Sequence, residues 1–172
     1  LFKNMSLLHN VMVGAHSTYK RGIKDVLFRT RSFRQEEEAS RLTALKWLEF
    51  VGLAEKKDLF PDQLTYAQQR FLEIARAMAS SPKVVLLDEP AAGMNPQESQ
   101  DLMAFIRGVQ KRFGLTILLI EHDMKVVMGV CEYIWVLDYG VKIAEGNPEA
   151  IQSNQKVIVA YLGEEYVKYA ES

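Results

Sequence analysis

Apolar residues recur at helical spacing in the first 80 positions of the chain. Within the stretch 36–51 they return at every third position, and Gly52 follows as a helix-stop residue. A second helix is predicted over residues 65–80. Its inward-facing residues are expected to be Phe71, Leu72, Ile74, Ala75 and Met78. We therefore predict that residues 1–80 are mainly helical.

Beyond residue 80 the pattern changes to short apolar runs. The runs "KVVLLDE", "LTILLIEH" and "YIWVLD" are rich in Val, Ile and Leu, which is typical of strands buried on both faces. A helix is predicted between the first two runs, because Asn95 and Glu98 form a capping box with Pro96 at the first helical position. This strand–helix–strand order predicts that the first two strands are parallel. A turn, a short strand and two helical pieces, 148–153 and 156–162, are expected after the third run.

Composition narrows the class of protein. The chain has 172 residues, of which 48% are hydrophobic and 25% charged, as is typical of a globular domain. Its net charge of −1 argues against a nucleic-acid partner. The single cysteine, Cys131, leaves no disulfide framework or cysteine metal cluster and fits a reducing compartment. Because no apolar run approaches the roughly 18 residues that span a bilayer, we expect any membrane role to depend on a partner.

Two carboxylates, Asp88 and Glu89, end the first apolar run at the strand edge where parallel sheets bind ligands. Neighbouring strand residues point to opposite sides, so one carboxylate can hold Mg²⁺ while the other activates water. His122 follows the second run at the same edge. Taken alone, the carboxylate pair also fits a structural strand terminus, and His122 also fits a capping or packing residue.

Thr65 and Gln68 form a T-x-x-Q capping box at the start of the second helix. A helix start presents unpaired N–H groups and the positive end of the helix dipole, which suit a phosphate group. Taken alone, the same pattern also fits a capped helix without a ligand.

Together these features resemble the nucleotide-binding subunit of ATP-binding cassette (ABC) transporters. "LTYAQ" resembles the signature motif LSGGQ, "VVLLDEP" the Walker B motif, "AGMN" the D-loop, and His122 the switch histidine. The segments "NVMVGAH", "DEPAAGMNP" and "VIVAYLGEE" are most similar to the branched-chain amino acid uptake ATPases of bacteria. The resemblance implies an α/β fold, with part of a P-loop NTPase (RecA-like) parallel sheet and an ABC-type helical subdomain.

The resemblance also implies a role for each matching residue. Asp88 would hold Mg²⁺, and Glu89 would be the general base for the water that attacks the γ-phosphate of ATP. His122 would contact that phosphate, and Asn95, at the D-loop aspartate position, would communicate across a dimer. The residues that would meet the γ-phosphate of ATP bound to the other subunit are Thr65, Tyr66, Ala67 and Gln68.

The chain departs from the family pattern at the signature motif and at the phosphate loop. Tyr66 and Ala67 replace the two signature glycines; Tyr is familiar in this branch, whereas Ala67 adds a methyl where glycine lets N–H groups approach phosphate. The sequence contains no G-x-x-x-x-G-K-[ST] motif and no Gly-Lys dipeptide. We therefore expect the chain to be the second half of a cassette, without Walker A motif and Q-loop, and inactive as an ATPase by itself.

The resemblance further implies domains and partners. We expect the helical subdomain with the signature motif at 1–80, the downstream half of the RecA-like core at 81–146, and a helical tail at 147–172. The implied partners are a second ATP-binding subunit, membrane permease subunits and, indirectly, a substrate-binding protein. The implied location is peripheral, on the cytoplasmic side of the membrane.

In the family's sheet the P-loop strand lies between two strands that correspond here to Leu115–Glu121 and Tyr133–Leu137. Because this chain contains no P-loop, both strands are expected to keep an unpaired edge. We therefore predict that the chain by itself self-associates through its strands.

Several interpretations compete. The leading one is an ATPase subunit that powers uptake of branched-chain or hydrophobic amino acids. A lipopolysaccharide-export ATPase shares the "YLGE" tail, and the isolated chain could be a non-catalytic module that presents the signature face or docks a permease. A helicase-type P-loop NTPase would explain Asp88 and Glu89 but not "LTYAQQR".

The basic run from Lys20 to Arg34 is either a solvated face or a contact for anionic headgroups or a permease.

Overall fold

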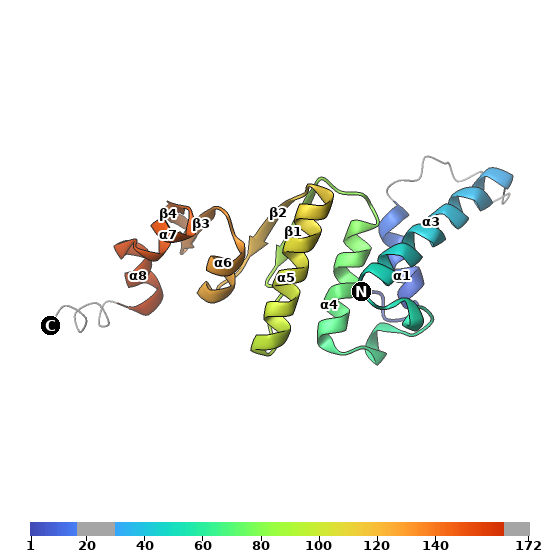
Figure 1. Cartoon of the computed structure of the whole chain (residues 1–172), viewed down its shortest axis with the longest axis horizontal. Helices are drawn as coiled ribbons and strands as arrows, with labels where there is room; N and C mark the ends of the chain where they lie inside the picture. Colours follow the sequence, from blue (N-terminus) through green and yellow to red (C-terminus); the bar gives the residue numbers. More distant parts are fainter. Residues whose placement is uncertain (17–29, 164–172) are drawn as a thin grey trace. The chain divides into compact units, whose positions relative to one another are not determined.

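The computed structural model describes residues 1–16 and 30–163, which divide into two compact units meeting at residues 120 and 121 (Figure 1). The elements of the first unit are α1 (Leu7–Ala15), α3 (Arg31–Phe50), two 3-10 helices (Ala54–Lys56 and Pro61–Gln63), α4 (Tyr66–Met78), β1 (Val84–Asp88), α5 (Pro96–Phe113) and β2 (Thr116–Ile120). The elements of the second unit are α6 (Met124–Val130), β3 (Ile134–Asp138), β4 (Val141–Gly146), α7 (Pro148–Gln152) and α8 (Gln155–Leu162).

The first three helices pack against one another, as Figure 1 shows at the blue-to-green part of the chain. Their shared core contains Leu7, Val11, Ala44, Leu48, Leu72 and Ala75, all buried. The predicted helical character of this region is confirmed. Helix α3 begins at Arg31 rather than at residue 36, because the Thr30 side chain caps it by accepting a hydrogen bond from the N–H of Phe33. Gly52 has a φ of +71° and ends the helix as predicted.

The strands β1 and β2 are parallel, which confirms the strand–helix–strand prediction. Their register places Val84 opposite Thr116 and Asp88 opposite Ile120. The linking helix α5 buries one side, including Leu102, Ile106 and Val109, as expected of a crossover helix that covers one face of its strands.

The expectation that these strands are buried on both faces is wrong for the described residues. Val85 is buried, but on the alternate positions Leu86 is 72% and Ile120 58% exposed. Val84 and Leu118 are also exposed. The physical reason is that strand side chains alternate between two faces, and the linking helix can cover only one of them. The apolar composition of a run does not reveal whether the second face is covered.

The second unit is built on an antiparallel hairpin of β3 and β4. Tyr139 and Gly140 form its two-residue turn with φ values of +44° and +79°, the combination that a type I′ turn requires. The predicted turn, short strand and two C-terminal helices are therefore confirmed, whereas α6 was not predicted. Ile134, Ile151 and Val157 form the buried centre. Within the part of the chain that the structure describes, β2 pairs with β1, and β3 pairs with β4.

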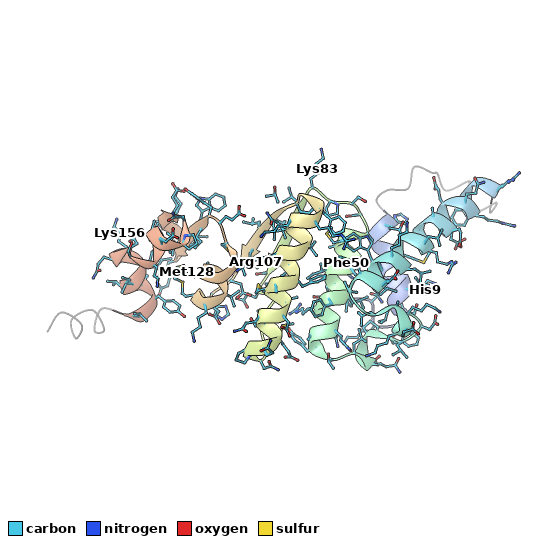
Figure 2. All side chains as sticks on the ribbon, viewed as in Figure 1. His9, Phe50, Lys83, Arg107, Met128 and Lys156 are labelled. Carbon is cyan, nitrogen blue, oxygen red and sulfur yellow. The ribbon has the colours of Figure 1, made fainter. Side chains whose placement is uncertain are left out.

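Aromatic side chains join α3, α4 and α5 within the first unit. Phe50, which is labelled in Figure 2, lies 5.5 Å from Phe105 between ring centroids, and Phe71 lies 5.0 Å from the same ring. Trp47 lies 5.0 Å from Phe113. Such tilted and edge-to-face pairs stabilise by about 0.5–1.5 kcal/mol each beyond area burial. The cluster fixes helix α4 relative to α5, and these two helices carry the candidate motifs at their N-terminal ends.

Gly14 provides a test of how closely α1 and α4 approach. A Cβ at this position would lie 1.9 Å from the carbonyl oxygen of Arg76, a distance that no side chain tolerates. We expect Gly14→Ala to destabilise the fold by about 1–3 kcal/mol or more, because the helices must separate. The matched control is Gly108→Ala, where nothing lies within 4 Å and alanine should stabilise helix α5 by about 1 kcal/mol. Thermal unfolding followed by circular dichroism measures both; a Gly14→Ala midpoint at or above that of the parent would contradict the packing.

Candidate functional site

The start of α4 is organised by a reciprocal capping box, as the sequence predicts. The hydroxyl of Thr65 accepts a hydrogen bond from the N–H of Gln68 at 3.3 Å, and the side-chain Oε1 of Gln68 accepts one from the N–H of Thr65 at 3.3 Å. The ammonium group of Lys56 also donates to this Oε1 at 3.3 Å. The first-turn N–H groups of a helix lack partners within the helix, so this end of α4 suits an anion. Lys56 adds a positive charge here, and the sequence alone did not predict it.

The ring of Tyr66 is held along helix α4 by Arg70. The guanidinium carbon of Arg70 lies 4.9 Å from the ring centroid, and its Nη2 donates a hydrogen bond to the Tyr66 hydroxyl. Arg70 Nη1 also donates to Glu73 Oε2 at 2.7 Å. Burial lowers the pKa of the Arg70 guanidinium, but the hydrogen bonds and charges of Glu73 and Tyr66 outweigh it and raise the pKa overall. Arg70 therefore remains charged beside the Tyr66 ring at physiological pH.

Asp88 is the last residue of β1 and lies opposite Ile120 of β2. Glu89 follows with a φ of +42°, in the left-handed region that a non-glycine residue rarely adopts. Its N–H donates to the Ile120 carbonyl at 2.9 Å. Holding such a conformation costs on the order of 1–3 kcal/mol and is found most often at functional sites. Ser81 and Tyr139 also have positive φ values, so this backbone conformation is a local feature of the chain that no sequence pattern could have revealed.

Two consecutive turns lead from Glu89 to Asn95. The N–H of Ala92 donates to the Glu89 carbonyl at 3.1 Å, and the N–H of Met94 donates to the Ala91 carbonyl at 3.2 Å. Asn95 then caps α5, since its Oδ1 accepts from the N–H of Glu98 at 2.9 Å, while Glu98 Oε2 accepts from the N–H of Asn95 at 3.1 Å. The predicted capping box is confirmed, and it fixes the end of the segment 89–95.

The structure brings the start of α4 together with the segment 89–95. A Cβ built on Gly93 would lie 3.7 Å from Cε1 of Tyr66, so the tyrosine ring lies near Gly93, with room between them for a methyl group. Gly93 has a φ of +76°, which favours glycine. His122 stands two residues after the end of β2, at the beginning of the second unit, and is exposed. Six of the eight predicted site residues thus lie on these two segments of the first unit, with Asp88 immediately before them and His122 in the second unit.

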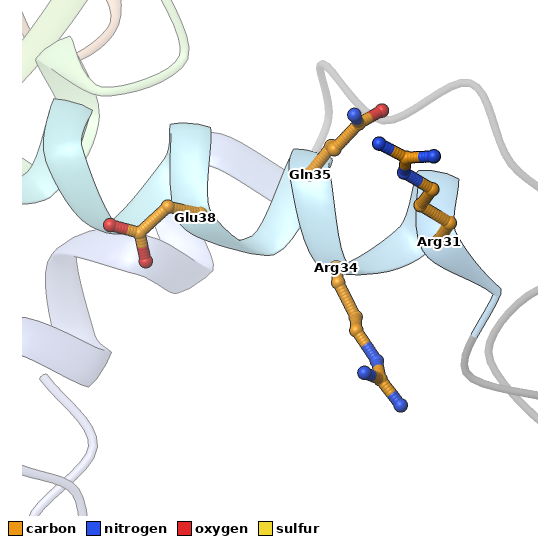
Figure 3. A pocket seen from close by; sticks show the side chains of 4 residues that line it. All are labelled: Arg31, Arg34, Gln35 and Glu38. Carbon is orange, nitrogen blue, oxygen red and sulfur yellow. The ribbon is translucent and has the colours of Figure 1, made fainter.

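A hollow on the surface lies away from these motifs, at the first turns of α3. It is lined by Arg31, Arg34, Gln35 and Glu38, whose side chains diverge from the helix in Figure 3. Glu38 is paired with Arg41 rather than with the arginines of the hollow. Most of the basic run 20–34 lies outside the described residues. The hollow brings no functional residues together.

A comparison with protein families identifies the chain. The family model described as "ABC transporter" matches residues 1–92, which is more than half of the sequence. The chain belongs to the ABC transporter family. A second model, described as "Branched-chain amino acid ATP-binding cassette transporter", matches residues 141–167.

Curated members of this ABC family are similar over nearly the whole chain. The high-affinity branched-chain amino acid transport ATP-binding protein LivG of Escherichia coli (strain K12) is 44% identical over 95% of this chain, and BraF of Pseudomonas aeruginosa is likewise 44% identical over 95%. The methionine import ATP-binding protein MetN 1 of Staphylococcus aureus is 31% identical over 93%. The chain spans 64% of the length of LivG and BraF and 44% of that of MetN 1.

Solved ABC cassettes share the fold. The ADP conformation of MJ1267, an ATP-binding cassette of an ABC transporter, matches with a TM-score of 0.74 and 30% identity, covering 94% of this chain and 64% of that one. A nucleotide-free ATP-binding cassette matches with a TM-score of 0.75 and 30% identity over the same shares. The predicted fold, part of a P-loop NTPase sheet with an ABC-type helical region, is confirmed. Among the described helices, none has the length and apolar character required to cross a membrane.

Proposed function

We propose that the chain is part of an ATP-hydrolysing subunit that powers import of branched-chain or related hydrophobic amino acids. The observation that carries this proposal is the 44% identity, over 95% of the chain, to two proteins named for branched-chain amino acid transport. The match of residues 141–167 to a branched-chain amino acid family supports the same substrate class. In this proposal residues 1–80 form the helical subdomain, 81–146 the downstream catalytic core, and 147–172 the tail.

The motif residues would act on ATP bound between two ATP-binding subunits. We infer that Glu89 is the general base for the attacking water and that His122 contacts the γ-phosphate. Thr65, Ala67 and Gln68, at the dipole-positive start of α4, would bind the γ-phosphate of ATP held by the opposite subunit. Tyr66 would belong to the same surface, and Asn95 would transmit the state of one site to the other. The cap that Asn95 forms supports a positional role, because its side chain is already held by α5.

Mg²⁺ would be held by Asp88, whose strand end is the edge at which parallel sheets bind ligands. Among the described residues, no group of three or more His, Cys, Asp or Glu side chains forms a protein-only metal cage. A single carboxylate fits Mg²⁺, because this ion usually combines one or two carboxylates with phosphate oxygens and water. When bound, the ion would neutralise charge on the phosphates.

The proposed partners are a second ATP-binding subunit and membrane permease subunits, with the subunit peripheral on the cytoplasmic side. In this arrangement the amino acid is selected by the permease and an external substrate-binding protein. The ATP-binding subunit supplies the energy through closure around ATP.

Uptake by cells tests the substrate class. In bacteria lacking their own branched-chain amino acid ATP-binding subunits, the whole subunit, expressed with its permease and binding protein, should restore uptake of radiolabelled leucine. The Asp88→Asn variant should not restore leucine uptake, because the proposed Mg²⁺ ligand loses its negative charge. The relative named for methionine import makes methionine the proper competitor. Restored methionine uptake without leucine uptake would overturn the proposed substrate.

A further inference from the structure

Lys56 reaches the start of the signature helix α4 from a separate element of the first unit. It is the last residue of the 3-10 helix Ala54–Lys56, which precedes α4. Its ammonium group donates a partly buried hydrogen bond to Oε1 of Gln68 at 3.3 Å, across twelve positions of the sequence. Neither the capping box nor the spacing of residues on one helix produces this contact, so it is a tertiary feature of the fold.

The backbone that carries Lys56 is fixed by hydrogen bonds on both sides. The Lys56 N–H donates to the Leu53 carbonyl at 3.0 Å, and the Lys56 carbonyl accepts from the N–H of Leu59 at 2.9 Å. Leu53 is buried in the helical core. The Leu59 carbonyl accepts in turn from the N–H of Leu7, at the start of α1, at 2.9 Å. The ammonium group is therefore presented from a fixed turn, and only the side chain of Lys56 has to be ordered to form the contact.

The contact determines which way the side-chain amide of Gln68 faces. Its Oε1 accepts from the Lys56 ammonium group and from the N–H of Thr65, each at 3.3 Å. Because an ammonium group and a backbone N–H can only donate, the amide oxygen must face them and Nε2 must face away. Within the described residues Nε2 donates to no protein acceptor. Its N–H groups are therefore available to an anion at the start of α4.

Lys56 differs from the lysine that follows it in how its charge is neutralised. The ammonium group of Lys57 is paired with the carboxylate of Asp58. In the part of the chain that the structure describes, no carboxylate forms a salt bridge with Lys56. Its positive charge therefore adds to the positive end of the α4 dipole and to the first-turn N–H groups. A phosphate group that approaches this helix start is attracted by all of these.

We propose that Lys56 is a positioning residue of the signature site, which holds the amide N–H groups of Gln68 toward the γ-phosphate of ATP bound to the opposite subunit. Its charge also attracts that phosphate as two subunits approach. Lys56 acts when the subunits close around ATP, and not when a single subunit first binds ATP. The identity of the anion rests on the proposed function, whereas the contact between Lys56 and Gln68 does not.

NMR of the Gln68 side-chain amide tests the contact in the whole subunit without nucleotide. Isotope-labelled glutamine side chains give the signals, and Gln68→Glu assigns the signal of this residue by removing it. Lys56→Met removes the ammonium group and keeps an unbranched stem, so it should shift the Gln68 signal because Oε1 loses one donor. Lys57→Met is the matched control and should leave the signal in place. An unshifted signal in Lys56→Met, or an equal shift in Lys57→Met, overturns the contact.

ATP-driven association of two subunits tests the functional part, on the Glu89→Gln background in which hydrolysis is slow. Light scattering should show that Lys56→Met weakens association about tenfold, the effect of losing one charged hydrogen bond at a partly exposed position. Lys57→Met should leave association unchanged. Binding of a fluorescent ATP analogue to the monomer should be unchanged in both variants, a result that a general loss of the fold would not give.

The outcomes separate this inference from the proposed function. Association of Lys56→Met as strong as that of its parent, equal weakening by Lys57→Met, or an equal loss of ATP binding by the monomer would overturn the role of Lys56. If the wild-type subunit hydrolyses no ATP and the Glu89→Gln parent does not associate with ATP, the proposed function fails. The Gln68 signal still decides in that case whether Lys56 holds this side chain.

Discussion

The whole subunit carrying Glu89→Gln should hydrolyse ATP about 10²–10⁴ times more slowly than the wild type while still binding ATP. Glutamine matches glutamate in shape but cannot take a proton from water. Both residues carry a Cβ, so the strain of the positive φ of +42° at this position is the same in the wild type and in the glutamine variant. The loss should therefore appear in kcat rather than in stability or in nucleotide affinity. Phosphate release and binding of a fluorescent ATP analogue measure the two properties separately.

Glu98→Gln provides the control for this experiment. Glu98 is a carboxylate in the first turn of α5. Its Oε2 caps the helix by accepting a hydrogen bond from the N–H of Asn95, which a glutamine side chain can also do. Activity should remain close to that of the wild type. Turnover by Glu89→Gln at a near-normal rate would exclude Glu89 as the base, and equal losses in both variants would indicate a general effect of removing charge.

Features that depend on close neighbours in the chain were predictable from the sequence. The capping boxes at Thr65 and Asn95 each involve two residues three positions apart. The residue types at these two positions are therefore enough to predict the hydrogen bonds of the box. The parallel pairing of β1 and β2 followed from a helix of sufficient length between two apolar runs. The resemblance to ABC proteins rests on these same local segments, which is why it identified the family correctly.

Features that depend on distant contacts were not predictable. The left-handed backbone of Glu89 arises where the chain leaves β1 next to Ile120, and nothing in the letters "DEP" specifies it. The four-residue spacing of Tyr66 and Arg70 could have suggested a pair on one helix face. The proximity of that ring to Gly93 is tertiary and required the structure. The exposed face of β1 and β2 was missed for the same reason, because burial depends on what covers a strand.

The 172-residue chain by itself should form dimers or larger species rather than a stable monomer. Within the described residues β2 is bonded to β1 alone, and a two-stranded sheet is at best marginally stable in water. Leu86 lies opposite Leu118 on the exposed face, with Val84 and Ile120 beside them. An exposed apolar strand edge offers unpaired N–H and C=O groups to another chain. A second copy of the chain can supply hydrogen-bond partners for the strand edge and can cover the apolar face. The proportion of dimers and larger species should therefore rise with protein concentration in sedimentation velocity experiments.

Charge placed on the exposed face should oppose this association. Leu86→Lys or Leu118→Lys should weaken it by about tenfold each, equivalent to about 1.4 kcal/mol, because pairing would bring an ammonium group into an apolar contact. Leu42→Lys is the matched control: this leucine is 48% exposed but lies on α3 and should leave association unchanged. A compact monomer at high concentration with a cooperative melt would contradict the prediction and would mean that the chain covers its own strand edges. Association that Leu42→Lys weakens as much as Leu86→Lys would show that the contact does not involve the sheet.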